Sequence, residues 1–305
     1  MLYFIVNPTS SSGRGLQQWT AVEQELKARQ AAYEVFLLDA AGDAANVASF
    51  LSSQKRPCTI VVVGGDGTLN EVVNGLGTFQ QITLGNIPTG SGNDFARALK
   101  LPEDPSAAAQ MLLNPSRKIR VNVGRTASEG SSRRFIVSSG IGFDAAVCHV
   151  SVSSGVKSAL NKAHMGQMIY TANALALLSR LQPSGMRIIL DDREFHSFDH
   201  VLFAAAMNTK YEGGGYKFCP GANPTDGQLD LIVIDGIPKH RVPLLLPKAR
   251  SGKHIHEDGV HIFRCSRAVL TSETPLAVHT DGENAGVQNR VTFSLEPERI
   301  SVIIK

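Results

Sequence analysis

Apolar and polar positions follow each other in short blocks along the first part of the chain, and these blocks predict strands that alternate with helices. The clearest block is 60–63, four β-branched residues in a row, which is typical of a strand buried on both faces of a parallel sheet. Further apolar runs predict strands at 2–6, 33–38, 81–87 and 117–124, and helical spacing predicts helices at about 16–30, 44–53 and 106–113. We therefore expect βαβ units and an open, mostly parallel α/β sheet.

The pattern changes after residue 123. A mostly helical stretch is expected at about 145–181, and short strands separated by turn residues are expected at 133–139, 186–190, 194–206, 228–234, 260–270, 276–279, 291–295 and 299–303. Such strands are typical of a mainly antiparallel β-sandwich. We therefore expect two domains, an α/β domain at 1–123 and a β-sandwich domain at 124–305, whose last strand could pack back on the first domain.

The strand at 60–63 runs into the sequence GGDGT at 64–68, and a helical pattern follows. A strand, a glycine turn and a helix N-terminus form an anion site, because backbone N–H groups point outward and the helix dipole adds about 0.3–1 kcal/mol for a negative charge. The missing Cβ atoms also let a phosphate approach the main chain closely. The alternative is a tight turn in which Asp66 caps a helix.

Two more loops of small residues follow predicted strands, NPTSSSGRG at 7–15 and PTGSGNDFAR at 88–97. In such sheets ligands bind beyond the carboxyl ends of the strands, so the three loops are expected to converge on one crevice. Each loop also has a plainer interpretation. The first could be an ordinary βα loop, and Asn93 and Asp94 could serve only as helix caps.

Two acidic turns in the second half could carry chemistry, NPTDGQ at 223–228 and DGE at 281–283. A carboxylate of the DGE turn could accept a proton from a hydroxyl group or hold a metal ion. The alternative at both places is a hairpin turn.

Composition and charge narrow the function classes. The net charge of +3 and the pI near 8.7 fit an anionic membrane surface or a nucleotide substrate. No apolar run approaches the ~18–20 residues of a transmembrane helix, and the four cysteines lack metal-site spacing. We therefore expect a cytoplasmic protein that binds no nucleic acid. The segment 238–256 mixes leucines with basic residues, so it could lie on a membrane surface, or it could be an ordinary surface helix.

Together these motifs resemble the bacterial diacylglycerol kinase-like lipid kinases, relatives of the eukaryotic diacylglycerol, sphingosine and ceramide kinases. GGDGT alone is shared with NAD kinases and, loosely, with phosphofructokinases. The later motifs are more particular to the lipid kinases: GSGNDFAR at 90–97, GIGFDA at 140–145, YEGGGYKFCPGANPTDGQLDL at 211–231, GKHI at 252–255 and DGE at 281–283. The resemblance covers nearly the whole chain and implies a lipid-binding role for the second domain.

The resemblance also implies the site residues. It implies ATP between the two domains, bound by Asn7, Thr9, Gly64, Gly65, Asp66, Gly67, Thr68, Leu69, Asn70 and Ser91. It implies that Glu283 is the general base and that Asp66 and Asp94 lie beside the phosphates and catalytic Mg²⁺. A second, structural Mg²⁺ is expected at Asn223, Asp226 and Gln228. Two departures from the family pattern are the extra serines at 10–12 and Ser91, where the family often has threonine.

The expected function is transfer of the ATP γ-phosphate to diacylglycerol or a related lipid alcohol, giving phosphatidic acid or its equivalent in phospholipid metabolism. The protein would then contact the inner membrane face transiently, and it could form a homodimer. Two alternatives stay open, a kinase for a soluble hydroxyl substrate such as NAD and a regulator that binds nucleotide or lipid without catalysis. The second alternative predicts missing carboxylates, whereas Asp66, Asp94 and Glu283 are all present.

Overall fold

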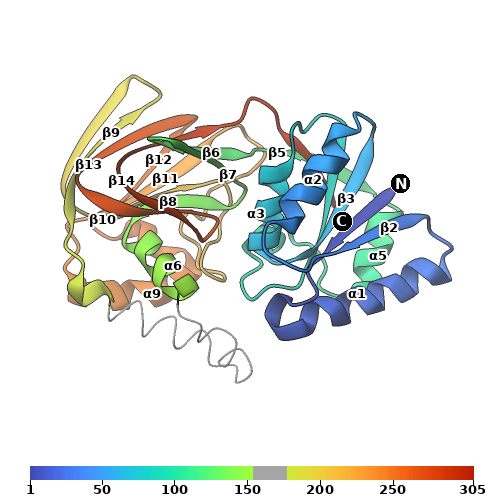
Figure 1. The fold of residues 1–305 in the computed structure, drawn as a ribbon. Coiled ribbons are helices and arrows are strands. Elements are labelled where there is room, and N and C mark those ends of the chain that lie inside the picture. Colours follow the sequence, from blue (N-terminus) through green and yellow to red (C-terminus); the bar gives the residue numbers. More distant parts are fainter. Residues whose placement is uncertain (154–176) are drawn as a thin grey trace. The chain divides into compact units, whose positions relative to one another are not determined.

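The computed structural model describes residues 1–153 and 177–305. They form two compact units, the first made of residues 1–123 and 297–305 and the second of residues 124–296 (Figure 1). Each unit has its own sheet. Much of the helical stretch expected at 145–181 falls on residues 154–176, which lie outside the described part. No helix in that part is both long enough and apolar enough to cross a membrane.

The first unit contains a six-stranded sheet in the order β2-β1-β3-β4-β15-β5. Its strands are β1 (Leu2–Val6), β2 (Tyr33–Leu37), β3 (Cys58–Gly64), β4 (Ile82–Pro88), β5 (Arg117–Val121) and β15 (Ile300–Ile304). All pairs are parallel except β15 with β5, which confirms the predicted mostly parallel α/β sheet. The side chains of 60–63 are fully buried, as the run of β-branched residues predicts.

Helices cover both faces of this sheet. They are α1 (Ser10–Ala28), α2 (Asp43–Ser53), α3 (Asp66–Gly75), α4 (Asp94–Leu99) and α5 (Pro105–Leu113). Figure 1 shows α1 and α5 on one face and α2 and α3 on the other. Trp19 and Leu26 of α1 pack with Leu112 of α5 against Phe4 and Val61 of the sheet, so one apolar core fixes the strand ends from which the loops project.

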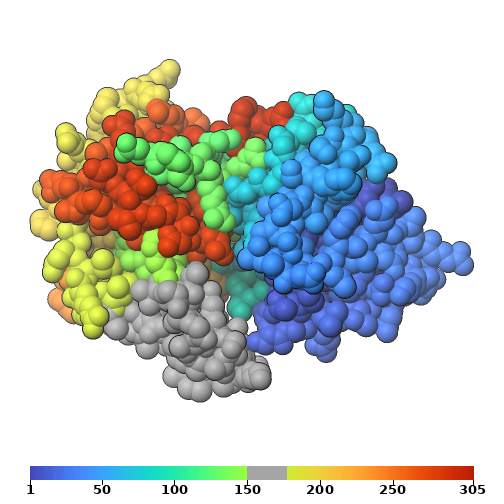
Figure 2. All heavy atoms as spheres, viewed as in Figure 1, coloured from blue at the N-terminus to red at the C-terminus, as the bar shows by residue number. Residues whose placement is uncertain are grey.

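The second unit contains a nine-stranded sheet in which every pair is antiparallel. Its strands are β6 (Gly124–Ser128), β7 (Ser131–Phe135), β8 (Ser138–Gly142), β9 (Ser184–Leu190), β10 (Glu194–Met207), β11 (Leu229–Asp235), β12 (Val260–Cys265), β13 (Arg267–Thr280) and β14 (Glu283–Leu295). In Figure 2 the atoms of β13 and β14, orange to red, cover much of the visible face of this unit. The predicted antiparallel, sandwich-like architecture is confirmed.

Strands β10 and β11 are apolar on both faces because both faces are covered. Leu231 and Val233 of β11 point into the sandwich core, whereas Ile232 and Ile234 point to the other face. That other face is covered by the helical elements α6 (Phe143–Ser153), α9 (Val242–Ser251) and η3 (Lys253–His256), and the short helix η2 (Lys239–Arg241) directly precedes α9. This second, smaller apolar layer holds the pocket described below.

Several predicted strands have different bounds in the structure, and the strand expected at 133–139 is divided between β7 and β8. The strand expected at 260–270 is broken at Ser266, because the carboxylate of Asp191 accepts hydrogen bonds from the backbone N–H groups of Ser266 and Arg267. The strand expected at 117–124 ends at Val121, and 276–279 is the end of the long strand β13. Bonds made by a distant residue such as Asp191 leave no trace in the local apolar pattern.

Candidate active site

The three loops of small residues in the first unit are joined by side-chain hydrogen bonds. Asn7 Nδ2 donates to Thr68 Oγ1 at 3.0 Å, which joins the loop after β1 to α3. Ser10 Oγ and Thr89 Oγ1 lie 2.6 Å apart, which joins the loop after β1 to the loop after β4. The loops that the sequence analysis expects at one edge of the sheet therefore do lie together.

The main chains of two of these loops meet at glycines. A Cβ atom on Gly65 would lie 2.9 Å from Gly90 Cα, and a Cβ atom on Gly90 would lie 2.6 Å from Gly65 Cα. The backbone N–H of Thr89 donates to the carbonyl oxygen of Gly64 at 3.0 Å. Glycine is therefore required at 65 and 90 so that the two loops can approach each other this closely.

Asp66 bridges the same two loops. Its carboxylate accepts hydrogen bonds from the backbone N–H groups of Asp94 at 2.9 Å and Phe95 at 3.2 Å. Asp66 thus caps α4, and not the helix α3 in which it lies. Burial raises the pKa of Asp66, and the two backbone hydrogen bonds lower it in part. Asp94 is buried at the start of α4, where Arg97 Nε lies 3.8 Å from its Oδ1 atom.

The loop after β1 has a left-handed backbone where the helix would otherwise start. Ser11, Ser12 and Gly13 have φ values of 46°, 61° and 98°, so regular α1 begins only after them. Thr9 Oγ1 donates to Asn7 Oδ1 at 3.0 Å, and Ser11 Oγ lies 3.4 Å from Ser91 Oγ. Small residues in such a loop leave main-chain N–H groups accessible to an anion.

Most residues predicted to bind ATP thus belong to one group of loops. Asn7, Thr68 and Ser91 take part in side-chain contacts that join these loops, and Thr9 donates to Asn7 within the loop after β1. Leu69 and Asn70 are buried inside α3. Hydroxyl groups, closely approaching main chains and helix starts suit a polyphosphate, so the residues present fit ATP.

The DGE turn in the second unit joins β13 to β14. Asp281 and Gly282 have φ values of 49° and 82°, and Thr280 pairs with Glu283, so the hairpin interpretation describes the turn correctly. The carboxylate of Asp281 accepts hydrogen bonds from the backbone N–H groups of Ile136, Val137 and Ser138 at 2.8–2.9 Å. Asp281 therefore fixes the turn, and Glu283 is its partly exposed carboxylate.

The acidic turn at 223–228 is the last part of the long loop that joins the paired antiparallel strands β10 and β11, so it is not a tight hairpin turn. Asp226 Oδ1 accepts a hydrogen bond from Gln228 N at 2.9 Å, and Asp226 Oδ2 pairs with the guanidinium group of Arg264. Both carboxylate oxygens therefore have partners. The predicted structural Mg²⁺ stays a prediction, and these residues fit it only if Arg264 moves away.

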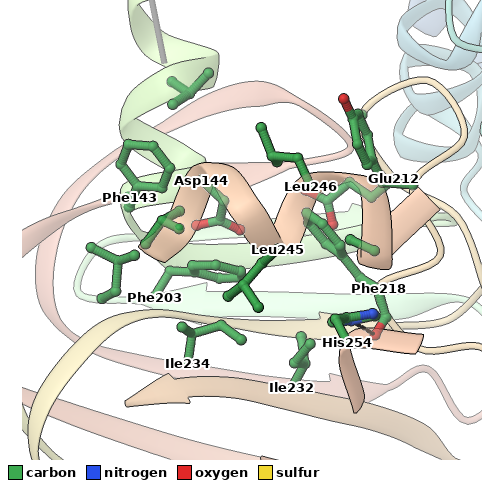
Figure 3. A pocket seen from close by; sticks show the side chains of 16 residues that line it. Phe143, Asp144, Phe203, Glu212, Phe218, Ile232, Ile234, Leu245, Leu246 and His254 are labelled. Atoms are coloured by element: carbon green, nitrogen blue, oxygen red, sulfur yellow. Dashed lines mark hydrogen bonds between the residues drawn. The ribbon is translucent and has the colours of Figure 1, made fainter. Parts of the chain in front are cut away.

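An apolar cavity of about 120 Å³ lies in the second unit between α6, α9 and the strands β10 and β11 (Figure 3). Figure 3 shows Leu245 of α9 facing Ile232 and Ile234 of β11. Five residues of the segment 238–256 line this pocket, while Leu244 of α9 is 67% exposed. Asp144 and Glu212 place two carboxyl groups in the otherwise apolar lining.

These two carboxyl groups meet a buried imidazole. Asp144 Oδ2 lies 3.2 Å and Glu212 Oε1 lies 3.3 Å from His279 Nε2, and we call these three residues the polar cluster. A Cβ atom on Gly140 would lie 2.1 Å from Asp144 Oδ2, so the first glycine of GIGFDA makes room for the cluster. Burial raises the pKa of Asp144, and the hydrogen bond to His279 lowers it in part.

Asp144 and Glu212 belong to motifs that the sequence shows, but their role could not be predicted from those motifs, and His279 lies in a predicted strand without any motif. The sequence signal that could have indicated a site here is the pair of glycine-rich motifs GIGFDA at 140–145 and YEGGGY at 211–216. Gly213, Gly214 and Gly215 all have positive φ, and they form a tight loop that returns Tyr216 to pair with Glu212.

Two family models match the chain. The one described as "Diacylglycerol kinase catalytic domain" matches residues 1–125, and the one described as "YegS C-terminal NAD kinase beta sandwich-like domain" matches residues 140–304. A diacylglycerol kinase of Bacillus subtilis is 30% identical to this chain over 287 residues, which cover 93% of this chain and 89% of the relative.

Two solved structures share the fold. A diacylglycerol kinase from Bacillus anthracis superposes with a TM-score of 0.71 at 20% identity, covering 100% of this chain and 96% of that chain. An NAD kinase from Archaeoglobus fulgidus in complex with ATP superposes with a TM-score of 0.55 at 14% identity, covering 99% and 93%. At these identities the likeness concerns the fold alone, and it confirms the predicted NAD kinase-like architecture.

Proposed function

Because the chain belongs to the diacylglycerol kinase family, as its motifs predict, we propose that it is an ATP-dependent lipid kinase. It transfers the γ-phosphoryl group of ATP to the hydroxyl group of diacylglycerol or a related lipid alcohol. The observation that carries this proposal is the pocket of the second unit, whose lining is mostly apolar and includes the carboxyl groups of Asp144 and Glu212. An amphiphile with a hydroxyl group fits such a lining.

The first unit would hold the nucleotide. The loops joined by Asn7, Ser10 and Thr68 supply hydroxyl and main-chain N–H groups for the phosphates. Asp94 lies at the start of α4, on the loop that Asp66 fixes, so its carboxyl group is the candidate for holding Mg²⁺. Bound Mg²⁺ would neutralise charge on the phosphates.

Glu283 is the proposed general base. It would take the proton of the lipid hydroxyl while the oxygen forms a bond to the γ-phosphorus and the bond from that phosphorus to the bridging oxygen of ADP breaks. Three backbone hydrogen bonds to Asp281 hold the turn that carries Glu283, so the carboxylate has a defined position within its unit.

Helix α9 is the proposed membrane contact. It lines the pocket with Leu245 and Leu246 and exposes Leu244, and basic side chains flank these leucines. Basic residues near anionic lipid each contribute about 1 kcal/mol of binding. A lipid could then enter the pocket from the bilayer beside α9.

A phosphorylation assay tests this function. The protein is mixed with ³²P-labelled ATP, Mg²⁺ and detergent-dispersed diacylglycerol, monoacylglycerol, sphingosine, ceramide or phosphatidylglycerol, and separately with NAD. Labelled lipid is expected, and Glu283→Gln should lower the rate by about 10²–10⁴-fold while ATP binding persists. The matched control, Glu194→Gln, changes a largely exposed glutamate of the same unit.

Other outcomes are equally clear. Near-normal turnover by Glu283→Gln would remove Glu283 from its role. Labelled NAD without labelled lipid would support a soluble-substrate kinase, and no consumption of ATP with any acceptor would support a regulator without catalysis.

A further inference from the structure

One buried carboxyl oxygen in the pocket lacks a partner. Glu212 is 9% exposed, and its Oε2 atom has no hydrogen-bond partner within residues 1–153 and 177–305. A buried polar atom left without a hydrogen bond costs free energy of folding. Glu212 also lines the pocket, so a ligand that donates a hydrogen bond there would recover this cost.

The chemistry of the lining restricts that ligand. A carboxyl oxygen such as Oε2 of Glu212 is a hydrogen-bond acceptor, so a ligand group that donates a hydrogen bond would satisfy it. The neighbouring walls are aliphatic and aromatic, among them Phe203, Ile232 and Leu245. A lipid whose head group carries a hydroxyl donor satisfies both conditions, whereas the same lipid with that hydroxyl esterified leaves Oε2 unpaired.

His279 joins this place to the DGE turn. Its ring is fully buried, and the backbone N–H of Gly282 donates to Nδ1 at 3.2 Å. Nδ1 is therefore an acceptor, so the ring proton lies on Nε2, which faces the carboxyl groups of Asp144 and Glu212 at 3.2 and 3.3 Å. Gly282 directly precedes Glu283, so one side chain contacts both the lining of the pocket and the turn of the proposed base.

The same geometry argues against a metal ion in the polar cluster. One ligand atom from each of the three residues lies within 4.8 Å of the others, which is close enough for a shared ion. A histidine that ligates a metal normally donates its second ring N–H to an acceptor, whereas Nδ1 of His279 accepts an N–H group. The cluster is therefore arranged as a hydrogen-bond network.

We propose that Glu212 is the specificity-determining residue of the pocket, accepting a hydrogen bond from the lipid hydroxyl in the bound substrate before that proton passes to Glu283 during transfer. We propose further that His279 is a positioning residue that links this contact to the turn bearing Glu283. The inference rests on the proposed lipid kinase function and deepens it. It assigns selection of the lipid head group to Oε2 of Glu212, and it assigns the placement of Glu283 to the buried ring of His279.

Binding measurements test the role of Glu212 without catalysis. Titration calorimetry compares 1,2-dihexanoylglycerol with its 3-acetyl ester, which lacks the hydroxyl donor. The wild type is expected to bind the alcohol at least about tenfold more tightly. Glu212→Leu should bring this ratio close to one, because no acceptor for the hydroxyl remains. Its thermal midpoint is measured as well, since the change also removes Oε1, which faces His279. Glu212→Gln is the second variant should the leucine disturb folding, and Glu194→Leu is the matched control.

Two variants divide the role of His279. His279→Asn keeps an acceptor near the Nδ1 position and loses the donor at Nε2, so KM for the lipid should rise with little change in kcat. His279→Gln keeps a donor near the Nε2 position and loses the acceptor for Gly282, so kcat should fall with little change in KM. A merely structural histidine would give two variants that lose stability together and show no such split.

The outcomes separate this inference from the proposed function. An active wild type whose Glu212 variants keep the alcohol preference, or whose His279 variants show no split, overturns the inference alone. A wild type that prefers the alcohol in calorimetry and loses the preference in Glu212→Leu, but phosphorylates no lipid, overturns the kinase function and supports the role of Glu212.

Discussion

The two candidate sites of this protein are built from different materials. In the first unit the site is made of main chain and hydroxyl groups, with Gly65 and Gly90 in near contact and Asp66 holding the start of α4. In the second unit the site is made of large apolar side chains around the carboxyl groups of Asp144 and Glu212. The first site offers N–H and hydroxyl groups to a ligand. The second offers an apolar surface and the carboxyl oxygens of Asp144 and Glu212 as hydrogen-bond acceptors.

This difference determines which substitutions should weaken ligand binding at each site. A polyphosphate is held by dipoles of the main chain, so the first site should be sensitive to any atom that keeps two loops apart. An amphiphile is held by wall area and a few polar groups, so the second site should tolerate small changes of shape and be sensitive to changes of functional group.

A large effect on nucleotide binding is expected from Gly65→Ala. The new Cβ atom would lie 2.9 Å from Gly90 Cα, so the two loops must move apart. A displacement of about 1 Å at such a site costs up to about 100-fold, and we expect ATP affinity measured by calorimetry to fall about 10- to 100-fold.

Gly77→Ala is the control for this variant, because its Cβ atom would meet only Ser52 Oγ at 3.8 Å. Binding of dihexanoylglycerol should be unchanged in both variants. Wild-type ATP affinity in Gly65→Ala would show that close approach of the loops is not what binds the nucleotide.

A smaller effect is expected at His254, which lines the pocket. Burial lowers the pKa of His254, and a hydrogen bond to the Phe218 carbonyl oxygen raises it in part. The folded state therefore keeps this histidine neutral where the unfolded chain, with a pKa of about 6.5, already binds a proton. Stability from this group is present above pH 6.5 and is lost as pH falls below it, by at most about 1.4 kcal/mol per pH unit.

Thermal midpoints at pH 7.5 and 5.5 measure this loss. His254→Gln, which has an amide donor and does not titrate in this range, should lose less stability on acidification than the wild type. The exposed control His240→Gln should behave like the wild type, and an equal loss in all three proteins would contradict the prediction.

The smallest effect concerns the turn at 223–228. Mg²⁺ can reach Asp226 there only when the Arg264 guanidinium group leaves, and an exposed ion pair of this kind is worth about 0.2–1 kcal/mol. Arg264→Gln should therefore show the Mg²⁺-dependent rise of its thermal midpoint at a concentration up to about fivefold lower than the wild type. Arg267→Gln, which removes the pair with Asp192, is the control. No Mg²⁺ response in either protein would remove this metal site.

The two sites also differ in how far the sequence could predict them. The loops around Gly65 and Asp94 are short contiguous motifs that follow buried strands, so local pattern and the sheet rule together predict that they meet. The polar cluster joins residues 144, 212 and 279, each from a different element. Every one of these positions is unremarkable in its own segment, and only the tertiary fold brings them to one point.

Roles within a motif were harder to predict than the motif itself. Asp66 caps α4, a helix that begins 28 positions later along the chain, and Asp281 bonds to the main chain of 136–138. Asp66 and Asp94 belong to the first unit and Glu283 belongs to the second. That these three carboxyl groups act on the same phosphate stays a prediction.

The place of β15 has a consequence for synthesis in the cell. This strand lies inside the first unit's sheet, between β4 and β5, yet residues 300–304 leave the ribosome only after the whole second unit has been translated. Chains generally fold from the N-terminus as they emerge, but here β4 and β5 must wait for the strand that separates them. The half that is translated first is therefore the half that closes last.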